Sequence, residues 1–389
     1  MQGTNRMSWQ QLLILELKAI FNDRALLLTV FGGVVFYSFL YPLPYSEQLP
    51  RNQAVVVVDL DSSSLSRKLI RMVDASPQVQ VKRYTYSLPE AQEAIVEDGL
   101  AGMLVIPKHF YRDLLLGKHP TLSYAGDASY FLVYSKVVKG LATAGATLAA
   151  QIKVKRLLIS GQPLIAAKQQ YSAVRLNLRP VFNTTTGYIN YILPAVFVLI
   201  LHQTLLIGTG LLGVGQGEKT TVGSSGYWLQ VPSWKLIFTR AFIFLVIYLI
   251  LVFYYFGFCF EFYGISKLAH PLQLIQLAIP FLLATTFLGI SISQVIPRRE
   301  LATGIVILTS LPIVFTAGFA WPTNMLPAPL LSLSQLIPAI PGIQAFLQLN
   351  QMGADFQQVR PLFLQLWLQT ILYAILAWWL VKKRSTLFR

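Results

Sequence analysis

The sequence predicts a polytopic α-helical membrane protein with six transmembrane helices, a small α/β extracytoplasmic domain inserted between helices 1 and 2, and a re-entrant helical hairpin between helices 5 and 6. Of its 389 residues, 54% are hydrophobic and only 12% are charged, and the mean hydropathy of +0.56 lies outside the range of soluble domains. The 31 Lys and Arg residues outnumber 16 Asp and Glu residues, but they fall between apolar blocks, so we expect no nucleic-acid partner.

Six uncharged apolar stretches come close to the roughly 20 residues that a membrane-spanning helix needs. They are residues 25–41, 188–214, 241–260, 271–296, 301–321 and 362–381. No small-residue cleavage site follows the first stretch, so we expect an uncleaved anchor rather than a signal peptide. The preceding residues, 1–24, contain an amphipathic pattern suited to a helix in the headgroup layer.

Lys and Arg in the short connecting segments indicate the orientation of the spans. One side of the predicted membrane holds two, Lys267 and Arg360. The other side holds twelve: Arg6, Lys18, Arg24, Lys219, Lys235, Arg240, Arg298, Arg299, Lys382, Lys383, Arg384 and Arg389. This asymmetry predicts that both termini, with the basic C-terminal tail, are cytoplasmic and that residues 42–187 are external.

Residues 42–187 alternate between strand and helix patterns. Strand candidates are residues 54–59, 79–84, 102–106 and 121–124. Helix candidates are residues 65–73, a helix opening at Ser87 with a capping-box pattern, residues 107–116 with proline first, and residues 128–160. We expect a small α/β domain with the last, long helix as its stalk.

Residues 322–361 are apolar but broken by repeated prolines. Irregular backbone at membrane depth is tolerated only where it packs against protein or lines a wet cavity. We therefore expect a re-entrant helix pair on the external side.

The sequence contains no recognisable catalytic or metal-binding constellation. Cys259 is the single cysteine, and the four histidines lack metal-ligand spacing. Residues 213–220 approach the phosphate-loop pattern, but Glu218 stands where the last glycine belongs and would repel a phosphate. We expect no ATP binding there, and instead a flexible cytoplasmic segment over residues 213–226.

The order of these parts resembles the permease subunits of ABC-2 type ABC transporters, in particular the drug- or lipid-exporter-like members with a large external domain. The resemblance covers nearly the whole chain. Its motifs are Val55-Val-Val-Val-Asp59, Gly99-Leu-Ala-Gly-Met-Leu-Val-Ile-Pro107, Gly318-Phe-Ala-Trp321-Pro322 and Met325-Leu-Pro327.

The resemblance implies a permease in the bacterial inner membrane, powered by separate cytoplasmic ABC ATPase subunits that bind the ATP and Mg, so that this chain is no enzyme and holds no cofactor. The further implied partners are a second permease copy or a related permease, a periplasmic membrane-fusion protein, and membrane lipids. Coupling to the ATPase is expected at Glu218 and Lys219 in the first cytoplasmic loop and at Arg298 and Arg299 in the next.

The predicted spans contain no Asp, Glu, Lys or Arg, which favours hydrophobic or amphipathic cargo such as drug- or lipid-like molecules. His202, Gln203 and Thr204 lie near the middle of the second span, where they either line the substrate pathway or form interhelical hydrogen bonds. Trp321 and Pro322 are the candidate external gate. An alternative function is a membrane-anchored periplasmic receptor or assembly scaffold, although six uncharged spans exceed what an anchor needs.

Overall fold

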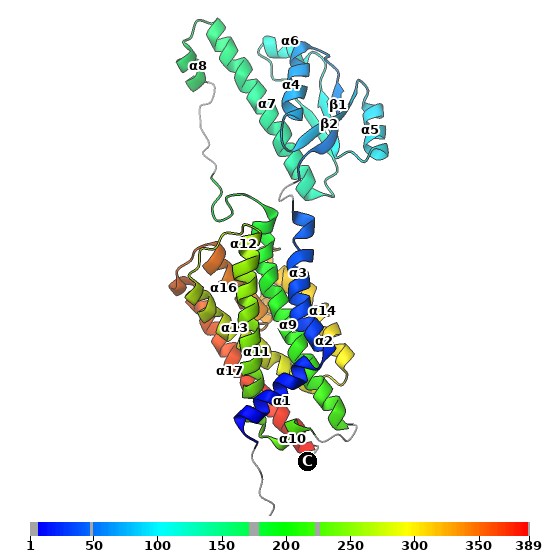
Figure 1. Ribbon diagram of the computed structural model, residues 1–389. Helices are drawn as coiled ribbons and strands as arrows, with labels where there is room; N and C mark the ends of the chain where they lie inside the picture. Colours follow the sequence, from blue (N-terminus) through cyan, green and yellow to red (C-terminus); the bar gives the residue numbers. More distant parts are fainter. Residues whose placement is uncertain (1–6, 47–49, 171–178, 222–225, 388–389) are drawn as a thin grey trace, which may run out of the picture. The chain divides into compact units, whose positions relative to one another are not determined.

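A computed structural model of the chain describes residues 7–46, 50–170, 179–221 and 226–387. The chain divides into two compact units, which we call the membrane unit (Met1–Ser46 and Pro180–Arg389) and the sheet unit (Glu47–Arg179) (Figure 1). The described residues include six helices long and apolar enough to cross a membrane, together with one bent helix pair. A four-stranded sheet forms the sheet unit, so the predicted fold class is confirmed.

The candidate spans are α-helical except for π-helical turns in the first and third and a 3₁₀ turn at the end of the first. The first, Arg24–Tyr45, comprises α2 (Arg24–Leu27), the π-helix η1 (Leu28–Gly33), α3 (Val34–Leu40) and η2 (Leu43–Tyr45). The third, Ser233–Phe262, comprises α11 (Ser233–Phe253), the π-helix η3 (Tyr254–Cys259) and α12 (Phe260–Phe262). The remaining spans are α9 (Tyr188–Thr221), α13 (Pro271–Val295), α14 (Arg299–Thr316) and α17 (Phe356–Leu387).

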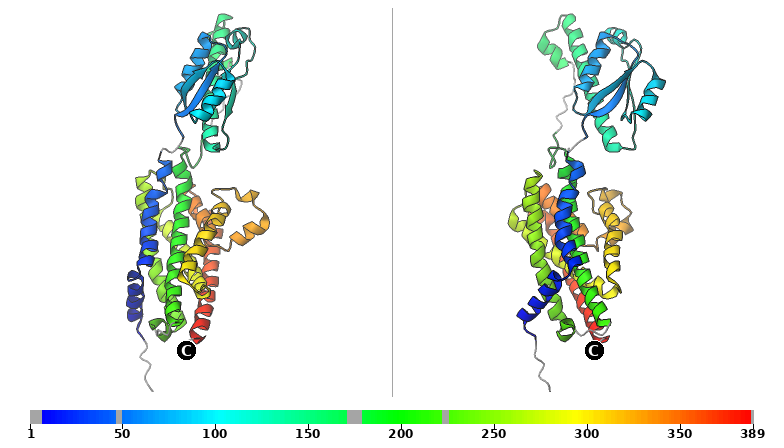
Figure 2. Two further views of the ribbon diagram at one scale, coloured as in Figure 1. Left: turned by 90° about the vertical axis from the view of Figure 1, so that its right-hand side faces the viewer. Right: turned by 45° about the vertical axis from the view of Figure 1, so that its right-hand side comes forward.

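Helix α9 is the centre of the membrane unit. In the apolar part of α9, 89% of the residues are buried, whereas only 22% are buried in the apolar parts of α14 and α17. Helices α14 and α17 therefore present apolar faces to lipid or to another chain. Figure 2 shows α9 in green with the first span and α11 beside it. Phe197 of α9 stacks on Tyr255, with ring centroids 4.1 Å apart, and the Tyr255 hydroxyl donates to the Val34 carbonyl at 2.8 Å. These contacts join three spans in one core.

The proline-rich segment before α17 forms the bent pair. After the short η4 (Thr323–Met325), α15 (Ala328–Ser334) meets α16 (Ala339–Phe346) and the π-helix η5 (Leu347–Gln351) at 88°. At the bend the carbonyl of Gln335 accepts hydrogen bonds from the side chains of Gln365 (3.1 Å) and Gln369 (2.7 Å) of α17. A broken helix is stable at membrane depth when neighbouring helices satisfy such freed backbone groups.

The strands of the sheet unit are β1 (Gln53–Asp59), β2 (Val79–Thr85), β3 (Gly102–Ile106) and β4 (Ser123–Gly126), and its helices are α4 (Ser64–Asp74), α5 (Leu88–Glu97), α6 (Phe110–Leu115), α7 (Phe131–Ile159) and α8 (Leu164–Gln170). The strand order is β2-β1-β3-β4, with β1 parallel to β2 and β3, and β4 antiparallel to β3. Side chains of β1 alternate: Val55 and Val57 join the cluster with α4 and α7, whereas Val56 and Val58 join the cluster with α5. Burial on both faces explains the continuous valine run.

Three local predictions for this unit need correction. Ser87 forms no side-chain cap on α5; the Thr85 hydroxyl bonds the Glu90 carboxylate instead. Helix α6 begins at Phe110, because His109 adopts a left-handed backbone (φ 63°) that breaks the helix predicted from residue 107. Helix α7 buries Val137 and other apolar residues in the sheet's core, so it belongs to the domain and is more than a stalk.

Candidate functional site

Several helices end together at one end of the membrane unit, with basic residues such as Lys18, Lys219 and Arg384 in their last turns, and we call this the basic end. It contains α1 (Trp9–Phe21), α10 (Tyr227–Gln230), the start of α11 and the C-terminal end of α17 (Figure 1). Leu12 of α1 packs there with Val231, Leu236 and Val381. Helix α1 is the helix predicted from the amphipathic pattern in residues 1–24, and it packs against α11. It begins with a capping box between Ser8 and Gln11.

A buried ion pair joins α1 to α11. Glu16 is 0% exposed and Arg240 is 2% exposed. The Arg240 guanidinium donates from Nε to Glu16 Oε2 at 2.9 Å and from Nη2 to Glu16 Oε1 at 2.8 Å. This two-pronged geometry is the strongest arrangement of an Arg–carboxylate pair and fixes the angle between the two helices.

Gln216 and Tyr227 extend the ion pair to α9 and α10. Arg240 Nη2 also donates to Gln216 Oε1 at 2.7 Å, and the Tyr227 hydroxyl donates to Glu16 Oε1 at 2.9 Å. Gln216 Nε2 in turn donates to the Tyr227 oxygen at 3.0 Å. Burial and then the adjacent Glu16 carboxylate raise the pKa of Tyr227, so this hydroxyl stays a donor at physiological pH. The four side chains form one closed network, which we call the Glu16 network.

Sequence reasoning missed this network. From the sequence alone, Arg240 is one of twelve basic residues of the short segments, and residues 1–24, which include Glu16, show only an amphipathic pattern. The missed signal is spacing: Leu12, Glu16 and Ile20 recur every four residues, and all three are buried on one face of α1. A carboxylate on the apolar face of a helix requires a buried partner, and Arg240 supplies it.

A second polar link holds two of the predicted coupling residues together. The Glu218 carboxylate accepts the backbone N–H of Arg299 at 3.0 Å, in the first turn of α14, and the Arg299 guanidinium forms an ion pair with Asp23. Lys219 and Arg298 are exposed beside them. The four residues predicted to couple to the ATPase therefore lie close together. Glu218 and Arg299 bond within the chain, and Lys219 and Arg298 are exposed.

The predicted flexible segment is wrong for residues 213–221, because α9 continues to Thr221; residues 222–225 lie outside the described part of the chain. The glycines there serve close packing. A Cβ at Gly213 would lie 2.6 Å from Ser293 Cβ of α13, and the Arg384 guanidinium of α17 lies against Gly217.

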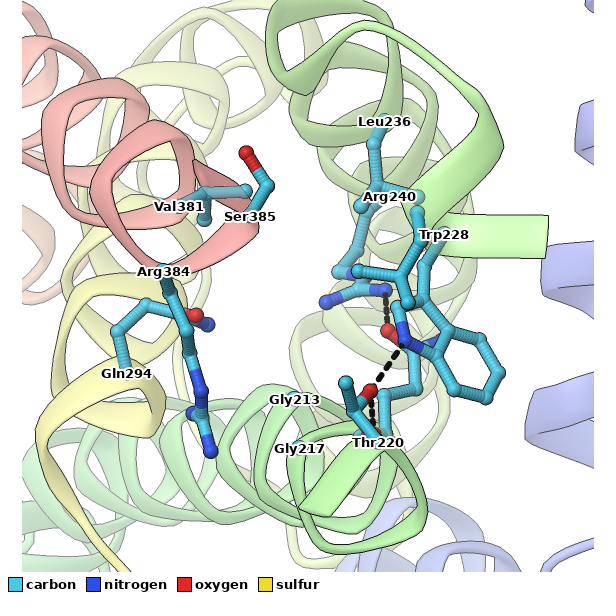
Figure 3. Close-up of a pocket in the computed structure, with 12 residues that line it drawn as sticks. Gly213, Gly217, Thr220, Trp228, Leu236, Arg240, Gln294, Val381, Arg384 and Ser385 are labelled. Carbon is cyan, nitrogen blue, oxygen red and sulfur yellow. Dashed lines mark hydrogen bonds between the residues drawn. The ribbon is translucent and has the colours of Figure 1, made fainter. Parts of the chain in front are cut away.

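A cavity of about 50 Å³ opens beside the Glu16 network (Figure 3). Arg240 and Arg384 approach it from opposite sides, and Arg384 donates to the Ser293 carbonyl at 3.2 Å. The Trp228 indole closes it by donating to Thr220 Oγ1 at 2.9 Å. Since one water molecule needs about 10–15 Å³ of such volume, the cavity has room for only a few water molecules. The cavity is far too small for a nucleotide.

The predicted pathway residues divide into buried and partly exposed positions. His202 (1% exposed) and Thr204 (6%) lie inside the chain's own core, and Thr204 Oγ1 donates to the Ile200 carbonyl at 2.7 Å. Gln203 is half-buried and donates to Ser310 Oγ of α14 at 2.6 Å. Trp321 and Pro322, the predicted gate, are exposed in the turn that follows α14.

Comparison with known protein families identifies a match to this chain. A family model described as "ABC-2 family transporter protein" matches residues 24–379, which spans both units. No curated protein shows significant similarity to the chain. Within the described ranges, no group of three or more His, Cys, Asp or Glu side chains could hold a metal ion.

Proposed function

The chain belongs to the ABC-2 transporter family, and we propose that it is the permease subunit of an exporter driven by a separate ABC ATPase that docks at the basic end. Permeases of this family have no ATPase site, bind no cofactor themselves and work with ATPase subunits. ATP and its Mg²⁺ then belong to the partner, and the permease converts the partner's nucleotide state into movement of its spans.

We place the basic end in the cytoplasm of a bacterial cell, with the chain in the inner membrane and the sheet unit outside. The support is the distribution of Lys and Arg in the short segments, twelve on this side against two on the other. Lys18, Lys219 and Arg384 belong to the first group.

The Glu16 network is the observation that carries the coupling proposal. Separating a buried ion pair leaves two charges without compensation, so α1, α9, α10 and α11 are held as one body. The Asp23–Arg299 pair and the Glu218 hydrogen bond attach α14 and the first span to that body. A push on any of these helix ends is therefore shared with the central helix α9.

Docking and positioning fall to different residues. Lys219 and Arg298 are exposed and are the residues we assign to contact with the ATPase. Glu218 and Arg299 position α9 against α14, because their polar groups already bond within the chain.

We propose hydrophobic or amphipathic, drug- or lipid-like cargo, moving along the face shared by α9 and α14 where Gln203 reaches the surface. Trp321 and Pro322 form the outer gate of this route. The exposed apolar face of α14 then meets a second permease, either another copy or a related chain, and a periplasmic membrane-fusion protein is a candidate partner of the sheet unit.

Purification of the tagged chain from its native membranes tests the proposal. We expect an ABC ATPase to co-purify and the complex to hydrolyse ATP. Charge reversal at the proposed docking residues, Lys219→Glu with Arg298→Glu, should lower the associated ATPase activity by about tenfold or more, because interface charges set encounter and register. Arg360→Glu, an exposed residue at the far end of α17, is the matched control and should change nothing. Full ATPase association in the double variant contradicts docking at the basic end.

A further inference from the structure

The sheet unit contains an open cavity of about 480 Å³ between the C-terminal end of α6 and the C-terminal half of α7, two helices labelled in Figure 1. Its volume lies within the range of about 300–1,000 Å³ that is usual for small-molecule sites. The cavity is formed within this unit alone, by residues 114–160.

The polar lining of the cavity is basic. Lys118 and His119 enter from the segment after α6, and Lys153 and Arg156 enter from α7. No carboxylate is among the residues that line it, and neither Lys118 nor Arg156 forms an ion pair with another described residue. The nearest acidic residue in the chain segment, Asp113, pairs with Arg112 instead. Lys118 and Arg156 therefore lack an anionic counterpart among the described residues.

The turn at the C-terminal end of α6 allows Lys118 and Arg156 to line the same cavity. The backbone N–H of Lys118 donates to the Asp113 carbonyl at 2.8 Å and that of Gly117 donates to the Leu114 carbonyl at 3.2 Å, the two bonds of a Schellman motif. Gly117 has a φ of +82°, and a Cβ there would lie 2.8 Å from Arg156 Nη2. Glycine at this position thus permits both the sharp turn that delivers Lys118 and the close approach of Arg156.

Apart from Ser160, the remaining side chains that line the cavity are apolar. Leu114 and Ile152 pack against the core cluster of the sheet, and Leu157 adds an aliphatic surface one residue beyond Arg156. The cavity therefore combines a fixed apolar wall with a cationic rim.

We propose that this cavity binds an anionic amphiphile, a molecule in which a carboxylate or phosphate group is attached to an apolar chain. Lys118, His119 and Arg156 receive the anionic group, because charge-assisted hydrogen bonds from basic side chains suit it. The apolar chain lies along Leu114, Ile152 and Leu157, where burial removes it from water. Binding here requires only the sheet unit's own residues and so is independent of ATPase docking.

Fluorescence titration of the full-length protein in phosphatidylcholine nanodiscs with dansyl-undecanoate tests the proposal. The double variant Lys118→Ala with Arg156→Ala should bind the probe about tenfold more weakly than the native chain. The matched control Lys155→Ala with Lys168→Ala removes the same charge from exposed residues of α7 and α8 that do not line the cavity, and it should bind as the native chain does. Equal probe affinity in the native chain and the Lys118/Arg156 variant would overturn the site.

Competition defines the ligand class. Dodecyl phosphate should displace the probe, whereas dodecanol and inorganic phosphate should not, since each lacks one half of the recognised chemistry. Displacement by dodecanol or by inorganic phosphate as effective as that by dodecyl phosphate contradicts an amphiphile site. Nanodiscs containing phosphatidylglycerol distinguish two sources of the ligand. If the native chain binds the probe more weakly there than in phosphatidylcholine nanodiscs, and the Lys118/Arg156 variant shows no such difference, the ligand is a bilayer lipid. If the native chain binds the probe equally in both, the ligand is a monomer from solution.

Discussion

Arg240, in the first half of α11, donates two hydrogen bonds of 2.9 and 2.8 Å to the Glu16 carboxylate of α1, although the two residues are 224 positions apart in the sequence. Both side chains are buried, so the pair holds α1 against a candidate membrane span without solvent screening. Helix α1 becomes in this way a rigid part of the basic end.

Removing one partner of this pair should destabilise the protein severely. In Glu16→Gln the Arg240 guanidinium stays buried without a counter-charge, which typically costs about 3–5 kcal/mol. We expect a marked fall in the yield of monodisperse protein and in its apparent melting temperature in detergent. Asp355→Asn, the same chemical change at an exposed carboxylate, should leave both values unchanged.

The double variant Glu16→Met with Arg240→Met distinguishes the effect of an uncompensated buried charge from the effect of losing the hydrogen bonds between the two side chains. Because both charges disappear together, most of the lost stability should return. A double variant as unstable as Glu16→Gln would show that the hydrogen-bonded geometry, rather than charge compensation, holds α1 in place.

Close packing of α9 on α13 should make Gly213 sensitive to a single methyl group. In Gly213→Ala the new Cβ meets Ser293 Cβ at 2.6 Å, so the helices must separate, at a cost of about 1–3 kcal/mol. Gly304→Ala in α14 meets nothing within 4 Å and is the control. Thermal unfolding of the two variants tests this contact, and equal stability of the two would show that α9 and α13 are not in close contact at this point.

Tyr227 should give the protein a stability that declines at alkaline pH. Its pKa in the folded chain is raised above the ordinary value of 10.0, so the folded state keeps a proton that the unfolded state loses as the pH rises past that value. Stability from this group is therefore complete below pH 10 and is lost above it. Tyr227→Phe lacks the hydroxyl and should be less stable by about 1–3 kcal/mol at neutral pH. The gap between the two proteins should narrow above pH 10, and a gap that stays constant would exclude a role for the hydroxyl proton.

The proposed pathway predicts a difference between two tryptophan substitutions. Gln203→Trp places a large ring on the partly exposed α9–α14 face and should abolish export of a lipophilic fluorescent dye from cells, while expression and ATPase association stay normal. Leu372→Trp changes an exposed residue on α17 and should leave export intact. Export that survives Gln203→Trp but fails in Leu372→Trp would move the pathway to α17.

The local patterns in the sequence predict most of the fold. The valine run at β1 requires cover on both faces, and the proline series before α17 requires a broken helix, so both features follow from short-range chemistry. The end of α9 could not be predicted in the same way. Gly213 and Gly217 suggest flexibility in a single sequence, whereas in the fold they provide room for Ser293 and Arg384.

The candidate site was predictable only where its residues are exposed or adjacent. Lys219 and Arg298 follow from the placement of charges between spans. The Glu16 network depends on tertiary contacts among four helices, and only the four-residue spacing of Glu16 with Leu12 and Ile20 signals that this carboxylate turns inward. The pathway role of His202 and Thr204 was predicted from their polarity within a span, and it stays a prediction; the structure adds that the packing of α9 buries both side chains within the chain.

Site-specific photocrosslinking in cells tests the coupling account most directly. The photoreactive residue p-benzoylphenylalanine is introduced in place of Lys219 at the basic end or, as a control, in place of Arg360 at the other end of the membrane unit. After irradiation, mass spectrometry of the adducts should identify an ABC ATPase joined to position 219 and none joined to position 360. An ATPase adduct at position 360, or its absence at position 219 in cells that transport the cargo, would contradict docking at the basic end.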